Sequence, residues 1–156
     1  ELYFVHNLKF KNTELEFLMD LKYFVDKFYL SERLNMEECL SEKEIRKFLE
    51  NCSSEYWDFF KQDTVLLHGD YWEGNVLWNN GEIAALIDWE NSCLGSRYFD
   101  VCNMRLELLF EYGYEVAKKF TDGYSKFFDL DKRKVAFFDL IVTLKFCGNL
   151  ENWGFT

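Results

Sequence analysis

The sequence predicts an α+β fold that is mainly helical and carries one small β-unit in its middle. Apolar residues recur at helical spacing over about 13–61 and again over 97–149. Short extended runs and an Asn-Gly turn stand between these segments, at 64–90. With 156 residues, of which 49% are hydrophobic, the chain is long enough for a single domain with a buried core.

The N-terminal segment is expected to be helical after an opening stretch, residues 1–12, that shows little pattern. Capping-box signatures at Thr13 and Ser41 open two predicted helices, over about 13–30 and 41–51. A further helical stretch surrounds Trp57. These elements precede the β-unit.

The β-unit begins with a short apolar run at 64–67, which predicts a buried strand. Residues 75–78 form a second extended run, Asn79-Asn80-Gly81 a turn, and residues 82–87 the return strand. An Asn-Gly turn between apolar runs is a strong local signal for a β-hairpin.

The helical pattern returns at Tyr98. An apolar stripe begins at Val101, a second helix carries Val116 and Phe120, and Asp131 opens a last helix. Neither repeats nor proline-rich linkers divide the chain.

Composition predicts a ring-rich core in a soluble protein. Aromatic residues make up 20% of the chain, and proline is absent. No stretch approaches the ~18 apolar residues of a membrane span. The N-terminus has no basic stretch followed by an apolar run, so it does not resemble a signal peptide. We therefore expect a cytoplasmic protein without a membrane partner.

The charge balance argues against nucleic acid as a partner. The chain has 18 basic and 28 acidic residues, hence a formal net charge of −10. Such a field repels phosphate backbones and favours a cationic or metal-bridged ligand.

The cysteines are expected to be reduced and structural. They are odd in number and lack metal-ligand spacing, and the chain has only two histidines. Burial as small hydrophobes is the expected role. The cysteines are Cys39, Cys52, Cys93, Cys102 and Cys147.

Three polar residues are placed oddly for a merely structural hairpin. Asp70 follows a predicted buried strand, Asn75 comes five residues later, and Asp88 ends the return strand. Because a hairpin brings its two ends together, these side chains should converge. Mg²⁺ prefers hard oxygen ligands and usually takes one or two carboxylates together with substrate phosphates. Asn75 and Asp88 suit that role, which leaves Asp70 to face a substrate hydroxyl.

The segments VLLHGDYWEGNVLW and ALIDWE resemble the catalytic core of the aminoglycoside phosphotransferase and choline kinase superfamily, which has a protein-kinase-like fold. The resemblance implies the C-terminal lobe of that fold, with Asp70 as catalytic base and Asn75 and Asp88 as metal ligands. It also implies that His68 braces the metal site. Asp100, in RYFDVCN, would hold the catalytic loop from below.

The family resemblance implies an ATP- and Mg²⁺-dependent phosphotransferase. The acceptor would be a hydroxyl of a small molecule, such as an aminoglycoside, choline or ethanolamine, and it can be cationic. The oligomeric state is open.

The chain also departs from the family pattern. The loop lacks the usual proline, and Gly95-Ser96-Arg97 stands where many relatives have Gly-Asp-Pro. The residues before Thr64 contain no glycine and have a helical pattern. They therefore supply no nucleotide-covering loop. We therefore expect the N-terminal nucleotide-binding lobe to be missing from this chain.

Glu90 and Trp72 are further candidates for substrate contact. Trp72 could form a cation-binding cage with Tyr71 and Trp89, although ordinary core packing is the expectation in so aromatic a chain. Two other functions stay open. The chain could be an incomplete or degenerate kinase lobe that serves as a non-catalytic binding module, or a helical interaction protein whose acidic loop binds metal incidentally.

Overall fold

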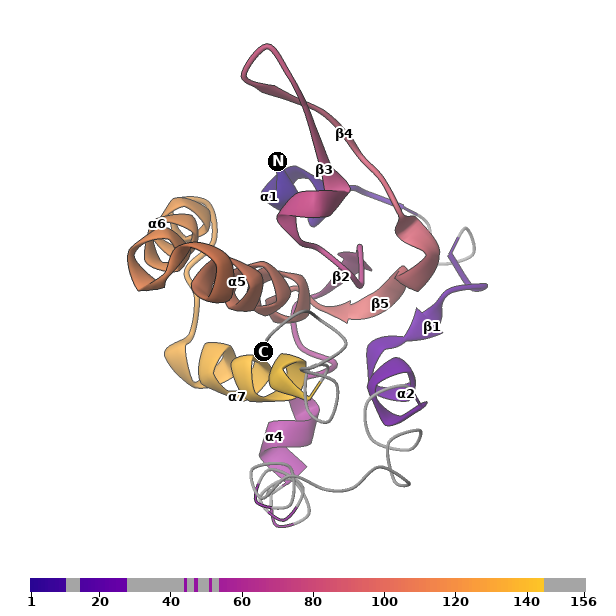
Figure 1. The fold of residues 1–156 in the computed structure, drawn as a ribbon. Helices are drawn as coiled ribbons and strands as arrows, with labels where there is room; N and C mark the ends of the chain where they lie inside the picture. Colours follow the sequence, from indigo (N-terminus) through magenta and orange to yellow (C-terminus); the bar gives the residue numbers. More distant parts are fainter. Residues whose placement is uncertain (11–14, 28–43, 45–46, 48–50, 52–53, 145–156) are drawn as a thin grey trace.

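The computed structural model describes residues 1–10, 15–27, 44, 47, 51 and 54–144 (Figure 1). Helices and strands alternate irregularly along the chain. In order they are α1 (Leu2–Val5), β1 (Met19–Asp20), α2 (Leu21–Val25), α4 (Ser54–Asp58), β2 (Thr64–Leu67), η3 (Glu73–Asn75), β3 (Val76–Asn79), β4 (Glu82–Leu86), η4 (Trp89–Asn91), β5 (Cys93–Ser96), α5 (Tyr98–Tyr112), α6 (Tyr114–Ser125) and α7 (Lys132–Thr143).

A three-stranded sheet lies in the body of the molecule, with β5 at its centre. β5 is parallel to β1 and antiparallel to β2, in a register that places Thr64 opposite Ser96 and Leu67 opposite Cys93. A Cβ atom added at Gly95 would overlap the side chain of Leu21. Glycine therefore allows α2 to pack directly on the central strand.

The predicted β-hairpin is confirmed and projects from the body (Figure 1). β3 and β4 pair antiparallel, and Asn79 lies opposite Glu82. Asn80 and Gly81 have φ angles of 51° and 83°, as a tight type I′ turn requires. The two strands form a sheet of their own.

The strand predicted at 64–67 is confirmed as β2. β2 pairs with β5, which was not predicted, rather than with the hairpin. β5 has the sequence Cys-Leu-Gly-Ser, which contains a glycine and no β-branched residue, so its local strand signal is weak.

Three helices follow the sheet, as the sequence predicts. α5 packs against both α6 and α7. Arg105 on α5 donates to both carboxylate oxygens of Asp139 on α7, at 3.1 and 3.0 Å. Asp131 caps α7 by accepting from the Arg133 amide at 2.8 Å. Residues 145–149 of the last predicted segment lie outside the described residues.

The expected ring-rich core is confirmed where α4, α5 and α7 meet the sheet. Phe60, Tyr98 and Phe138 are each at most 1% exposed. The ring centroids of Phe60 and Phe138 are 5.3 Å apart, and those of Tyr98 and Phe138 are 6.1 Å apart. Burying one such side chain contributes about 1.5–3 kcal/mol, so this cluster anchors the helices to the sheet.

The N-terminal helix predictions are partly wrong. Residues 1–12 were expected to lack pattern, yet Leu2–Val5 is helical. The helix predicted from Thr13 begins instead at Leu21, because Met19 and Asp20 pair with β5 and the Asp20 carboxylate accepts from the Lys22 amide at 2.9 Å.

The other two N-terminal predictions have different outcomes. The helix expected around Trp57 is confirmed as α4. The prediction for 41–51 falls largely outside the described residues, as does Thr13. Among the residues that are described, no helix is long and apolar enough to cross a membrane.

Candidate active site

The three residues predicted to carry the chemistry lie on two loops at the base of the hairpin. Asp70 follows β2, Asn75 ends η3 and Asp88 follows β4. The Asn75 side chain is buried, Asp70 is half-buried and Asp88 is exposed. The hairpin thus returns the chain to the loop from which it started.

Two hydrogen bonds join these loops, and a third lies within the first loop. Nε2 of His68 lies 2.8 Å from the carbonyl oxygen of Ile87 and donates to it. The Ile87 amide in turn donates to the carbonyl oxygen of Asn75 at 3.0 Å. Nδ2 of Asn75 donates to the carbonyl oxygen of Asp70 at 2.9 Å. Because Asp88 directly follows Ile87, the structure brings all three predicted residues to the same end of the hairpin.

These contacts leave two oxygen ligands for a cation. Since the Asn75 nitrogen donates to Asp70, the side-chain oxygen of Asn75 lies on the other side of the same amide group. The Asp88 carboxylate makes no hydrogen bond or ion pair with the described residues, and it does not cap η4, which it precedes. Both are hard oxygen donors of the kind that Mg²⁺ prefers.

Asp88 also has a strained backbone, with φ 64° and ψ 60° in the left-handed region. Such a conformation costs a residue other than glycine about 1–2 kcal/mol. Backbone strain of this kind is concentrated at functional sites, where it aims a side chain.

The described residues do not form a chelating cluster at this site. The described residues contain no group of three or more His, Cys, Asp or Glu side chains that could hold a metal ion. Asn75 and Asp88 would therefore share a cation with ligands from outside the protein. This donor set fits Mg²⁺, which usually keeps waters and binds substrate phosphates.

Asp100, in the first turn of α5, holds the loop that carries Asp70. Its fully buried carboxylate accepts from the amide of His68 at 2.7 Å and from the amide of Gly69 at 2.9 Å. The N-terminal end of α5 favours a negative charge there. A buried anion with two backbone donors is a stable anchor for a loop.

Gly69 allows the two loops to touch. Its φ of 83° disfavours any side chain, and a Cβ atom added to it would overlap the backbone carbonyl group of Asn91. Asn91 belongs to η4, three residues after Asp88. Glycine at this position therefore brings the segment after Asp88 against the segment before Asp70.

His68 is fully buried and links the hairpin to the loop. Its ring lies 4.6 Å from that of Trp89 and 6.0 Å from that of Tyr71, between centroids. Nδ1 has no partner among the described residues. Because Nε2 donates to Ile87, His68 supports the site through the backbone.

The candidate substrate contacts occupy different environments. Glu90 is exposed on η4, and Trp72 is 37% exposed with its ring over Gly74. Tyr71 is a core residue, 4% exposed, and burial raises its pKa to about 12. The expectation of core packing is confirmed for Tyr71, so a cage of three exposed rings does not form.

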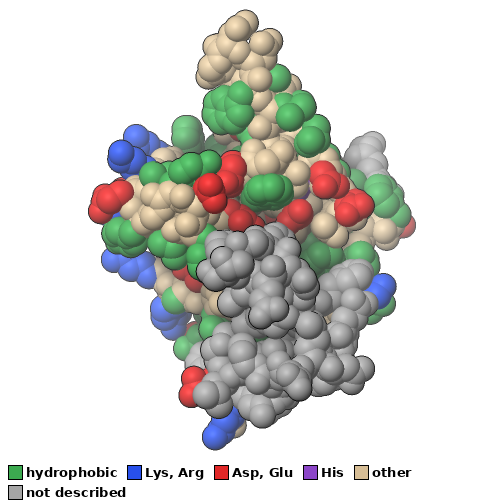
Figure 2. Space-filling view, in the orientation of Figure 1, with side chains coloured by type: hydrophobic (Ala, Val, Ile, Leu, Met, Phe, Trp, Pro, Cys, Tyr) green, Lys and Arg blue, Asp and Glu red, His purple; other side chains and the backbone are tan. Residues whose placement is uncertain are grey.

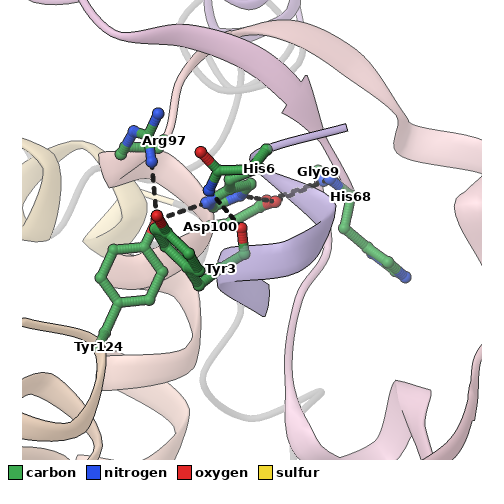
Figure 3. Close-up of polar contacts among 8 residues, drawn as sticks. Tyr3, His6, His68, Gly69, Arg97, Asp100 and Tyr124 are labelled. Atoms are coloured by element: carbon green, nitrogen blue, oxygen red, sulfur yellow. Dashed lines mark hydrogen bonds and ion pairs between the residues drawn. The ribbon is translucent and has the colours of Figure 1, made fainter. Parts of the chain in front are cut away.

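Sequence reasoning missed a group of residues that reaches Asp100 from other elements. His6, directly after α1, contacts the Asp100 carboxylate, and Tyr124 on α6 and Arg97 before α5 continue the hydrogen bonds behind it (Figure 3). The available signals were weak: His6 is one of only two histidines, and Arg97 opens the RYFDVCN segment.

A cavity of about 390 Å³ was also not predicted. It is mostly apolar and lies between α1, the hairpin, α5 and α6. One carboxylate oxygen of Glu73, which lines it, is buried and has no hydrogen-bond partner among the residues that the structure describes. Asp70, Asn75 and Asp88 are not among its lining residues. These are Glu1, Leu2, Tyr3, Tyr71, Glu73, Val76, Trp78, Ile83, Met104, Leu108, Phe120, Gly123, Tyr124 and Phe127.

The face below the projecting hairpin is acidic. Figure 2 shows several Asp and Glu side chains gathered there, whereas Lys and Arg side chains lie mainly toward the edges of this view. A local negative field attracts cations.

Comparison with known proteins gives one family. The model of the phosphotransferase enzyme family (APH) matches residues 5–138. No curated protein sequence matches the chain significantly.

Solved structures resemble the chain over most of its length. An aminoglycoside-3′-phosphotransferase of type VIII is 21% identical with a TM-score of 0.66, and the match covers 92% of this chain and 57% of that one. A macrolide 2′-phosphotransferase type I is 15% identical with a TM-score of 0.64, over 98% and 52%. An amicoumacin kinase solved in complex with AMP-PNP, Ca²⁺ and Ami is 18% identical with a TM-score of 0.53, over 92% and 45%.

These comparisons confirm the predicted family resemblance and the α+β, kinase-like fold class. The chain spans about half the length of the solved structures that it matches.

Proposed function

Because the chain belongs to the phosphotransferase enzyme family, we propose that it forms the catalytic lobe of an ATP- and Mg²⁺-dependent phosphotransferase, which moves the γ-phosphate onto a hydroxyl group of a small molecule. The observation that carries this proposal is the set of three hydrogen bonds that bring Asp70, Asn75 and Asp88 together.

Asp70 is proposed as the catalytic base. It orients the acceptor hydroxyl toward the γ-phosphorus and accepts its proton as the new O–P bond forms and the bond to the β-phosphate oxygen breaks. Asn75 and Asp88 would hold Mg²⁺, which supplies charge neutralisation at the phosphates when bound. Because the transition state is largely dissociative, positioning accounts for much of the rate, and anchoring of the loop by Asp100 supports it.

The acceptor is proposed to be an alcohol that carries amino groups. The net charge of −10 and the acidic face below the hairpin favour such a cation. Glu90 and Trp72 stay candidates for its contacts. The structural relatives are named for aminoglycosides, a macrolide and amicoumacin, and one was solved with an ATP analogue and a divalent cation. Use of ATP and the free, buried Cys93 and Cys102 support a cytoplasmic location.

The assignment of Asp70 is tested by transfer of ³²P from γ-labelled ATP in the full-length polypeptide. The acceptor panel comprises aminoglycosides, a macrolide, choline and ethanolamine. Asp70→Asn is expected to lower kcat by about 10³-fold or more. Asp122→Asn, which changes a 58% exposed carboxylate on α6, is the matched control and should retain the wild-type rate. Equal rates in Asp70→Asn and the wild type would refute the role of Asp70.

Calorimetric titration with Mg·ATP separates catalysis from binding. Asp88→Ala is expected to weaken Mg·ATP binding strongly, whereas Asp122→Asn leaves it unchanged. Binding that depends on Asp88 without transfer to any acceptor would favour the non-catalytic binding module. Metal binding that is indifferent to ATP would favour an incidental cation site.

A further inference from the structure

The Asp100 carboxylate has a third donor besides the two amides of the loop. Nε2 of His6 lies 3.1 Å from Oδ2 of Asp100, and the two residues are 94 positions apart (Figure 3). The side chains of both are completely buried. Because a carboxylate in this setting only accepts, Nε2 of His6 is the donor.

His6 is itself held by α6. Nδ1 of His6 lies 2.7 Å from the hydroxyl of Tyr124, and Nη1 of Arg97 donates to the same hydroxyl at 3.5 Å. Burial raises the pKa of Tyr124 to about 12, so its phenol stays protonated at neutral pH. The Tyr124 O–H can therefore donate to Nδ1, which leaves the Nε2 hydrogen of His6 for Asp100. The hydrogen bonds that run from Arg97 through Tyr124 and His6 are therefore all directed toward the Asp100 carboxylate.

The oxygen that receives His6 is one that also holds the catalytic loop. Oδ2 of Asp100 accepts from both Nε2 of His6 and the amide of His68, while Oδ1 accepts from Gly69. His6 thus fixes the plane of the carboxylate, and that plane sets where both loop amides lie. Without His6, Asp100 could rotate about its last side-chain bond and the two amides would follow it.

A purely structural role would not need a histidine here. α1 is already anchored by Leu2, which is 3% exposed and belongs to an apolar cluster with Tyr71, Val76 and Met104. A buried imidazole is costly unless both nitrogens are hydrogen-bonded. The arrangement around His6 meets that condition at both nitrogens.

We propose that His6 is a positioning residue for the catalytic loop: through Asp100 it aligns the backbone of His68 and Gly69, and thereby Asp70. This inference rests on the proposed function for its effect on catalysis, but its structural half can be measured without any substrate. A displacement of about 1 Å at a reacting group can lower a rate by about 10²-fold.

The test compares three variants of the full chain. His6→Leu removes the donor, His6→Gln restores an N–H near the position of Nε2, and Leu2→Ala weakens α1 by loss of packing while keeping His6. The first readout is hydrogen exchange of the His68 and Gly69 amides, compared at equal free energy of unfolding. We expect exchange to be about tenfold faster in His6→Leu than in Leu2→Ala, the effect of one lost hydrogen bond to a carboxylate, and close to wild type in His6→Gln.

The second readout is phosphoryl transfer. His6→Leu is expected to lower kcat by about 10²-fold with an unchanged KM for Mg·ATP, and His6→Gln to recover most of the rate. Should His6→Leu fail to fold, Tyr124→Phe carries the same comparison, because it removes the donor to Nδ1 and should speed exchange at both amides.

The two proposals fail in different ways. Equal exchange at His68 and Gly69 in the His6 variants and Leu2→Ala, or no response to Tyr124→Phe, would overturn the positioning role. A wild-type full-length polypeptide that transfers no phosphate to any acceptor, while exchange at these amides still depends on His6, would overturn the proposed function and retain the link from His6 to the loop.

Discussion

Asp100→Asn tests how strongly a buried carboxylate stabilises this fold. The substitution keeps the shape of the side chain, so it opens no cavity, but it replaces one acceptor oxygen by an NH₂ group. Three buried donors converge on the carboxylate, from His6, His68 and Gly69. Whichever way the amide turns, at least one of these N–H groups faces another donor.

The expected loss follows from these bonds. A hydrogen bond to a charged group contributes about 1.5–3 kcal/mol, and the two remaining bonds weaken when the charge is removed. Together these effects lower the free energy of unfolding by about 3 kcal/mol, against a total of about 5–15 kcal/mol for a typical protein. The variant should therefore still fold, with a urea midpoint lower by about 1–2 M.

Urea unfolding followed by tryptophan fluorescence measures this change. Asp122→Asn, on the exposed face of α6, is the control and should leave the midpoint where it is. A midpoint for Asp100→Asn within about 0.3 M of the wild type would show that the carboxylate does not hold the loop as the hydrogen bonds imply.

Three other predictions follow from single residues. Gly69→Ala is expected to lower both kcat and stability, because the new methyl group meets Asn91 and a φ of 83° costs a further ~1–2 kcal/mol; an unchanged urea midpoint and kcat would contradict this. Burial raises the pKa of Tyr71 to about 12. The folded protein therefore binds the phenol proton more tightly than the unfolded chain does, because the pKa in the unfolded chain has its ordinary value of 10. The stability from this residue is full below pH 10 and is lost as the pH rises toward 12. Tyr71→Phe should accordingly lose less stability than the wild type between pH 9 and pH 11 in urea titrations, and parallel losses would refute the shift. Burial also raises the pKa values of the Cys93 and Cys102 thiols, so mass spectrometry after iodoacetamide treatment at pH 8 should find both unmodified until urea is added.

The parts of the site that sequence reasoning placed are those with local spacing. Asp70 and Asn75 are five residues apart, and the Asn80-Gly81 turn returns the chain to Asp88, so one hairpin signal was enough to bring the three together. The helices after Tyr98 were likewise predicted from their own apolar periodicity.

The parts that sequence reasoning missed depend on distant partners. β1 is only two residues long, and its pairing with β5 overrides the helical pattern that predicted a helix from Thr13. β5 has too little strand propensity to be recognised without β2 beside it. His6 has no local pattern at all, because its role comes from a side chain 94 positions away. Long-range contacts of this kind leave no periodic trace in a single sequence.

Local and long-range contacts have different roles at this site. A local hydrogen bond joins Asn75 and Ile87 at the base of the hairpin, so it sets the distance between the two loops. Asp100 sets the orientation of the loop before Asp70 relative to the core, because it lies in the first turn of α5 and accepts from the His68 and Gly69 amides of that loop and from His6, which follows α1. An exposed catalytic group needs such a buried anchor, since positioning contributes to the rate only when the loop is held before the substrate arrives. In the proposed site the exposed Asp88 and the buried Asp100 are thus complementary: Asp88 would bind a ligand, whereas Asp100 holds the backbone of His68 and Gly69 next to Asp70.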